Sequence, residues 1–270
     1  MIGEMADLKK YFTVDDTTHA GQGIVLYKFD ASQSADFIQE MMIPMRDMFA
    51  SEEKIKCEME KYEKGREEII REHLPTKESI MSGDFGEALS YYVALEYFAK
   101  DANVAPKKLR FKGDPNSPLP KTDILLFEIK DREHPSPADI MYAIEVKTRK
   151  DSPSLVKKES SIKSAVEGAE TDRISRAAKT ITYLIKRIKD TGEPKELLDG
   201  VERFKDAFNK PYDKKYHAIA IVEEKFLARH IAHIEEKLPE KHPDIAVFSL
   251  PIADLEKMYN AFYTRMPIEA

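Results

Sequence analysis

The stretch KTDILLFEIKDREHPSPADIMYAIEVKTRK, residues 121–150, contains two apolar runs that are typical of core strands, yet each run carries charge at one end. Asp123 opens the first run, and Glu145 and Lys147 close the second. The polar segment between the runs contains two prolines and therefore predicts a loop. Charged side chains are seldom buried without a partner, so these three residues need a specific explanation.

An antiparallel hairpin gives the three charges a common location. His134 lies midway between Asp123 and Glu145 in the sequence, so a hairpin turning there would place the two carboxylates opposite each other. Side chains alternate along a strand, and Glu145 and Lys147 therefore share one face. The sequence predicts two carboxylates and one ammonium at one end of a sheet.

This grouping suits the hydrolysis of a phosphodiester. Carboxylate oxygens are the ligands that Mg²⁺ prefers, and a bound metal ion polarises a phosphoryl oxygen and activates water. Glu87, on an apolar helix predicted over 82–101, is the candidate for a third carboxylate, since a charge on such a helix is costly unless it is paired or metal-bound. An alternative is that Asp84 and Glu87 form a capping box at the start of this helix.

The rest of the chain predicts an α/β fold with a mixed central sheet flanked by helices. We expect a single domain over 1–270, with an N-terminal strand and helical annex in 1–75 and a core in 82–270. Strands are predicted at 21–30, 107–112, 215–224 and 245–250, and helices at 35–44, 51–74, 82–101, 172–190 and near the C-terminus. Residues 113–120 read as a loop, and residues 151–171 as a polar and mobile segment.

Composition excludes several classes of protein. The 270 residues contain no apolar run long enough to span a membrane, no signal-peptide pattern at the start and one cysteine, which together indicate a cytoplasmic protein without disulfides. No phosphate-binding loop for ATP and no nucleophile motif for acyl transfer is present. We expect no small-molecule cofactor and no membrane partner.

Charge is distributed unevenly along the chain. The net charge is −6, but residues 143–190 contain 12 lysines and arginines against 7 aspartates and glutamates. Local basicity of this kind indicates a phosphate-bearing partner such as DNA. The candidate contacts to the DNA backbone are Arg176, Lys179, Arg187 and Lys150. The alternative for the basic helix is an ordinary solvated face.

The constellation resembles the PD-(D/E)xK nuclease superfamily, in which a helix glutamate, a strand aspartate and the E-x-K of the next strand form a metal site. Here Glu87, Asp123 and the run Glu145-Val-Lys147 match those positions, whereas Thr122 stands where the pattern has proline. The segments GDFGEALSYYVALEY, PKTD and AIEVKTRK further resemble the HamA family, the nuclease subunits of the bacterial Hachiman anti-phage system. The resemblance implies a restriction-endonuclease-like four-stranded sheet, metal-dependent DNA cleavage and a helicase partner, HamB.

We therefore expect a deoxyribonuclease in which Glu87, Asp123 and Glu145 bind Mg²⁺ or Mn²⁺ and Lys147 acts on the attacking water. One alternative is a catalytically silent subunit that kept the nuclease fold and binds DNA as an adaptor. A second is a purely structural subunit. The amphipathic N-terminal helices are assigned either to docking of a partner or to packing on the chain's own sheet.

Overall fold

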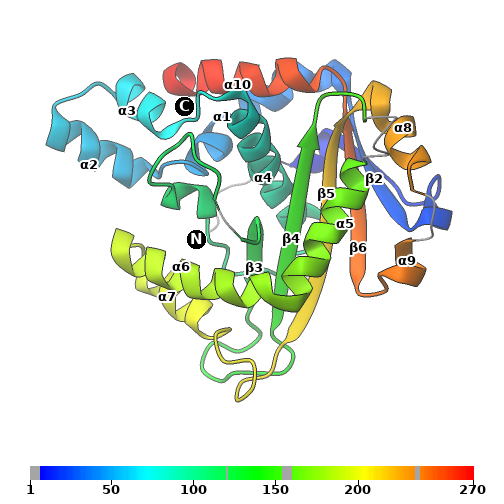
Figure 1. Ribbon diagram of the computed structural model, residues 1–270. Helices are drawn as coiled ribbons and strands as arrows, with labels where there is room; N and C mark the ends of the chain where they lie inside the picture. The colour runs from blue at the N-terminus through cyan, green and yellow to red at the C-terminus, as the bar shows by residue number, and fades with distance from the viewer. Residues whose placement is uncertain (1–6, 120, 154–159, 235–237) are drawn as a thin grey trace.

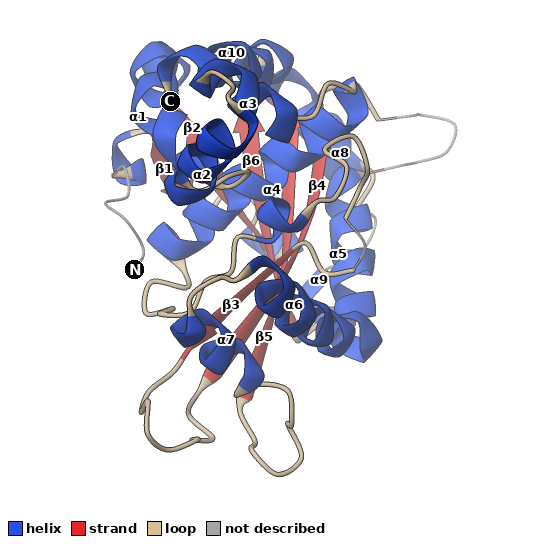
Figure 2. Cartoon of the chain, turned by 90° about the vertical axis from the view of Figure 1, so that its left-hand side faces the viewer, coloured by secondary structure: helices blue, strands red, loops and turns tan. Residues whose placement is uncertain are grey.

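The computed structural model describes residues 7–119, 121–153, 160–234 and 238–270. Within these residues a six-stranded sheet, in the order β1-β2-β6-β5-β4-β3, runs through the middle of the molecule with helices on both faces (Figures 1 and 2). The strands are β1 (Phe12–Asp15), β2 (Ile24–Phe29), β3 (Ile124–Glu128), β4 (Ile140–Arg149), β5 (Asp213–Glu223) and β6 (Ile245–Ile252).

The sheet is mixed, as the sequence predicts. Strands β2, β6, β5 and β4 are parallel, while β1 and β3 pair antiparallel at the two edges. The α/β fold with a helix-flanked central sheet is therefore confirmed. The four strands implied by the family resemblance are too few, because β1 and β2 extend the sheet beyond β6.

Two layers of helices cover the sheet. On one face lie α1 (Ser34–Asp47), α2 (Glu52–Tyr62), α3 (Arg66–His73), α4 (Glu78–Tyr97) and α10 (Leu255–Glu269). On the other lie α5 (Ser161–Thr171), α6 (Ala177–Thr191), α7 (Lys195–Glu202), α8 (Leu227–Ala232) and α9 (Leu238–Lys241). Because side chains alternate along a strand, each strand contributes residues to both cores. Ile144 of β4 faces the α4 side, and its neighbour Ala143 faces the α5 side.

Several predicted boundaries are wrong. Helix α1 continues through Pro44 to Asp47, so the predicted end of this helix at residue 44 is wrong. The predicted helix over 51–74 is two helices, because Glu63 takes a left-handed conformation with φ 55° and Gly65 starts the next helix. A backbone in that conformation cannot continue an α-helix.

Two segments next to the candidate active site, which is described below, also differ from the prediction. The predicted strand at 107–112 is a 3₁₀ turn, Lys108–Phe111, which sends Leu109 into one core and Phe111 into the other. The segment predicted to be polar and mobile contains α5, whose buried residues pack on β4 and β5. These residues are Ile162, Ala165, Val166 and Ala169. Residues 154–159 of that segment lie outside the described residues.

The N-terminal helices share the core of the main domain. Phe37 of α1, Ile55 of α2 and Ile69 of α3 are fully buried in the same cluster as α4 and α10. Helix α10 packs on α1, α3 and α4 and fastens these elements together (Figure 1). In the described part of the chain, no helix has the length and apolar character needed to cross a membrane.

Candidate active site at the open edge of strand β4

Strand β4 is longer than its edge neighbour β3, and this difference creates the site. The pairing with β3 ends at Ile124 opposite Ile144, so beyond that point β4 has no strand neighbour on this side among the described residues. The backbone N–H of Val146 donates instead to Oδ2 of Asp123, at 2.8 Å. The predicted register, with Asp123 opposite Glu145, is confirmed.

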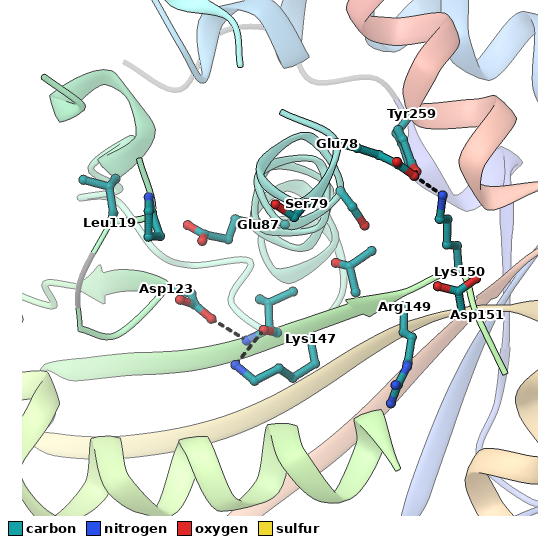
Figure 3. Close-up of a pocket in the computed structure, with 15 residues that line it drawn as sticks. Glu78, Ser79, Glu87, Leu119, Asp123, Lys147, Arg149, Lys150, Asp151 and Tyr259 are labelled. Atoms are coloured by element: carbon teal, nitrogen blue, oxygen red, sulfur yellow. Dashed lines mark hydrogen bonds and ion pairs between the residues drawn. The ribbon is translucent and has the colours of Figure 1, made fainter. Parts of the chain in front are cut away.

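An open hollow of about 770 Å³ adjoins this free edge. Glu87, Asp123 and Lys147 line it together, although they come from a helix, a loop end and a strand (Figure 3). Glu87 lies on the α4 side of the sheet, and Lys147 belongs to the set of β4 residues that face α5. Side chains from both faces can meet here because no further strand closes the edge.

Glu87 is not part of a capping box. Helix α4 begins at Glu78 with Lys77 as its N-cap residue, which places Asp84 and Glu87 inside the helix. Asp84 is buried and pairs with Lys112, with its Oδ2 2.5 Å from Nζ. The capping alternative is therefore wrong, because both backbone N–H groups concerned lie within the helical ladder.

One oxygen of the Glu87 carboxyl group has no hydrogen-bond partner among the described residues. Its Oε2 is shielded from solvent and receives no hydrogen bond. Burial, followed by the charge of Asp123, raises the pKa of Glu87 to about 8. Lys108 and Lys112 oppose this shift without cancelling it. With a pKa of about 8 this side chain is mainly protonated at neutral pH, and a cation beside Oε2 would favour its charged form.

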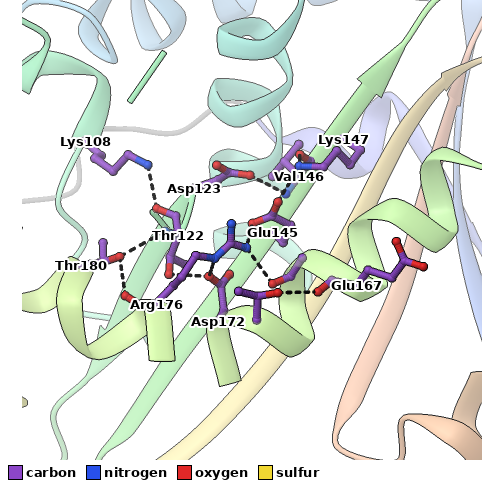
Figure 4. A network of polar contacts seen from close by, with 12 residues as sticks. Lys108, Thr122, Asp123, Glu145, Val146, Lys147, Glu167, Asp172, Arg176 and Thr180 are labelled. Atoms are coloured by element: carbon purple, nitrogen blue, oxygen red, sulfur yellow. Dashed lines mark hydrogen bonds and ion pairs between the residues drawn. The ribbon is translucent and has the colours of Figure 1, made fainter. Parts of the chain in front are cut away.

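Glu145 has the opposite surroundings, since cations hold both of its oxygens. Oε1 lies 2.5 Å from Nζ of Lys147, and Oε2 lies 2.7 Å from Nη2 of Arg176 (Figure 4). The side chain is only 3% exposed. Burial and the charge of Asp123 still raise the pKa of Glu145 to about 7. Burial lowers the pKa of Lys147, but Glu145 and Asp123 outweigh it, so the pKa is raised and the ammonium stays charged.

Helix α5 approaches Glu145 so closely that it needs a glycine. A Cβ atom added to Gly168 would lie 2.5 Å from Cδ, Cγ and Oε1 of Glu145. Real Cβ contacts are never this short, so any larger residue at 168 would displace the carboxylate or the helix.

Two carboxylates at the hollow have the chemistry of metal ligands. Glu87 and Asp123 offer hard oxygen donors of the kind that Mg²⁺ and Mn²⁺ prefer, and the unpartnered Oε2 of Glu87 fits a cation. In the described ranges no group of three or more His, Cys, Asp and Glu side chains is close enough to hold a metal ion. The chemistry of the donors thus fits a divalent ion, while Glu145 is bonded to Lys147 and Arg176.

The predicted DNA contacts differ in how free their side chains are. Lys150 pairs with Glu256 at 2.7 Å and with Glu78. Arg176 points inward to Glu145, and Arg187 donates to the carbonyl oxygen of Phe111 at 2.9 Å. Lys179 is exposed on α6. Contact of these four residues with DNA stays a prediction.

The fold and the site together define a mixed α/β protein with an acidic and lysine-bearing cluster at an open sheet edge. The chain belongs to the HamA family, whose family model matches residues 6–266. Membership of this family points to a role in anti-phage defence. The chain matches no curated protein.

Proposed function

We propose that this protein is a metal-dependent deoxyribonuclease and the effector subunit of an anti-phage defence complex. The observation that carries the proposal is the meeting of Glu87, Asp123 and Lys147 around one open hollow, with Glu145 directly behind Lys147. Family membership supports the defence role independently of this geometry.

Glu87, Asp123 and Glu145 would hold Mg²⁺ or Mn²⁺, which supplies Lewis-acid activation of a phosphoryl oxygen and of water. The carboxylate of Glu145 holds the Lys147 ammonium through Oε1. In the metal-free protein Glu145 and Asp123 raise the pKa of Lys147, which favours a role as a charged donor to a phosphate oxygen. The hollow is open, so an extended polymer can reach the edge of β4.

A catalytically silent DNA-binding subunit is the second candidate, and one observation favours it. Both oxygens of Glu145 are already bonded to cations, and the described carboxylates form no close metal cluster. The two candidates differ in one measurable respect, which is the cleavage of DNA.

Cleavage of plasmid and oligonucleotide DNA with Mg²⁺ or Mn²⁺, against EDTA, tests the proposal. The wild type is expected to cut in the presence of metal, and Lys147→Ala and Glu145→Ala are expected to lose activity by orders of magnitude. Metal-independent cutting, or a Glu145→Ala variant that cuts at the wild-type rate, contradicts the assignment. DNA binding by the wild type with no cleavage under any of these conditions supports the silent subunit.

The proposed partner is a helicase of the HamB kind. Near the site, Lys150 and Arg176 are engaged in ion pairs within the chain, which reduces the number of cations that the described residues offer to phosphates. So few contacts give weak capture of DNA at physiological salt, and a DNA-binding partner would supply the missing affinity. Co-expression with a helicase of the HamB kind and size-exclusion chromatography test this. Separate elution at micromolar concentration, with full anti-phage activity from this chain alone, would contradict it.

A further inference from the structure

A buried polar chain joins the two strand carboxylates from the α6 side of the sheet. Asp172 is fully buried, and its Oδ1 accepts hydrogen bonds from Oγ1 of Thr122 and from Nε of Arg176, both at 2.8 Å. Thr122 directly precedes Asp123, and Arg176 donates to Glu145 (Figure 4). One carboxylate thus ties the segment carrying Asp123 to the side chain that holds Glu145.

Arg176 is fixed at three points. Nε donates to Asp172, and Nη2 donates both to Oε2 of Glu145 and to the carbonyl oxygen of Gly168, each at 2.7 Å. A planar guanidinium held in this way has a single orientation, which an ammonium cannot reproduce. Arg176 is also absent from the residues that line the hollow, so it approaches Glu145 from the side of the helices.

The local backbone orients the side chains of Asp172 and Arg176. Residues Asp172–Arg176 form a π-helical turn between α5 and α6. Such turns are rare and occur frequently at functional sites, because the extra residue re-aims side chains that a regular helix would turn elsewhere. The turn is braced by Thr180, whose hydroxyl donates to the Arg176 carbonyl and accepts from the Thr122 N–H.

We infer that Arg176, oriented by Asp172, is a positioning residue that fixes the Glu145 carboxylate for the reaction at the β4 edge. This inference rests on the proposed nuclease function. Arg176 does not line the hollow, so its effect on the reaction would pass through Glu145. Gly168 completes the arrangement by leaving room for Glu145 and by supplying the second acceptor for Nη2.

Three variants of the full chain separate position from charge. Arg176→Gln removes the cation, Arg176→Lys keeps the charge without the three-point geometry, and Arg173→Gln is the matched control from the same turn. Arg173 is exposed and forms an ion pair with Glu170. Each variant is measured by DNA cleavage at saturating metal, by Mn²⁺ titration calorimetry without DNA, and by thermal unfolding.

For Arg176→Gln we expect kcat to fall by about 10- to 100-fold, the range found when a residue behind a metal ligand is changed, with KM for DNA unchanged. Mn²⁺ should bind at least as tightly as in the wild type, because a positive charge has left the neighbourhood of Glu145. Slower turnover with undiminished Mn²⁺ binding is the signature of lost positioning. Arg176→Lys should remain slow, and Arg173→Gln should match the wild type.

Other outcomes overturn the inference in distinguishable ways. Wild-type kcat in Arg176→Gln or in Arg176→Lys means that the fixed guanidinium is not needed. A fall in kcat together with weaker Mn²⁺ binding and a lower melting temperature means that Arg176 only supports the fold. If the wild type itself neither cuts DNA nor shows Mn²⁺ binding that Glu145→Gln weakens, the proposed function fails, and this inference falls with it.

Discussion

The unpartnered carboxylate of Glu87 makes the stability of the metal-free protein depend on pH in a way that Glu87→Gln should abolish. Burial and Asp123 raise the pKa of Glu87 from 4.5 to about 8. The folded protein therefore binds this proton more tightly than the unfolded chain does. The stabilisation is fully present below pH 4.5 and is lost as the pH rises through 8.

The size of the effect follows from the shift. Each pKa unit corresponds to about 1.4 kcal/mol, so the free energy of unfolding of the wild type should fall by roughly 2–4 kcal/mol between pH 5 and pH 9 through this group alone. The lower figure allows for water reaching the half-buried side chain. Glutamine has nearly the same size and does not titrate, so the difference between the two proteins isolates Glu87 from the neighbouring Asp84, Asp123, Lys108 and Lys112.

Urea unfolding of both proteins in EDTA at pH 5, 7 and 9 measures this difference. Relative to the wild type, Glu87→Gln should gain stability steadily from pH 5 to pH 9. Glu96→Gln, on the same helix and paired with Lys9 near the surface, is the matched control. A stability difference between Glu87→Gln and wild type that is the same at all three values refutes the reasoning.

Further variants test other parts of the site. Asp123→Ala or Glu145→Ala should abolish plasmid cleavage while leaving a cooperative thermal transition, which circular dichroism checks. Gly168→Ala should destabilise the protein by about 1–3 kcal/mol through the clash with Glu145, whereas Gly21→Ala, with open space around its Cβ, should not; chemical unfolding decides this. Lys179→Glu should lower the slope of log affinity for DNA against log salt by about one, and an unchanged slope assigns that lysine to the solvated surface.

The hairpin could be predicted from the sequence because its signals are local. Two apolar runs, a proline-bearing loop and the midpoint at His134 fix the register, and the structure pairs Ile124 with Ile144 accordingly. Asp123, Glu145 and Lys147 therefore lie just beyond the point where the pairing of β3 with β4 ends. Period-2 alternation and a single polar loop, residues 129–139, between two adjacent apolar runs leave few other arrangements.

The residues behind the site could not be predicted, since they depend on contacts distant in sequence. Asp172 meets Thr122 across 50 positions, and nothing in a polar segment announces that one aspartate will be buried. Arg176 looked like one of several basic residues opposite an apolar stripe, and only the π-helical turn directs it inward. For helix α5 a signal did exist: Ile162, Ala165, Val166 and Ala169 have helical spacing, which the surrounding serines and lysines obscured.

Charged side chains stand at the β4 edge, where apolar side chains would make the protein more stable. Replacing a buried ion pair by apolar side chains of similar size is often neutral or stabilising, and an unpaired buried carboxylate is worse than either. The raised pKa values of Glu87 and Glu145 mean that folding works against the charged forms of both groups at neutral pH. Leucine at either position would remove that cost.

A stability argument alone therefore gives no reason for these carboxylates, whereas a site that binds a cation does. Binding of a divalent ion would offset the repulsion among Glu87, Asp123 and Glu145, and the stability of the protein would rise with the logarithm of the ion concentration above its Kd. A cation would stabilise the charged form of Glu87 most, because its Oε2 has no hydrogen-bond partner among the described residues. It would stabilise Glu145 least, because Lys147 and Arg176 already neutralise that carboxylate. Glu87 and Asp123 are consequently the residues at which a metal ion would gain most, and Glu145 is the residue whose orientation the helices control.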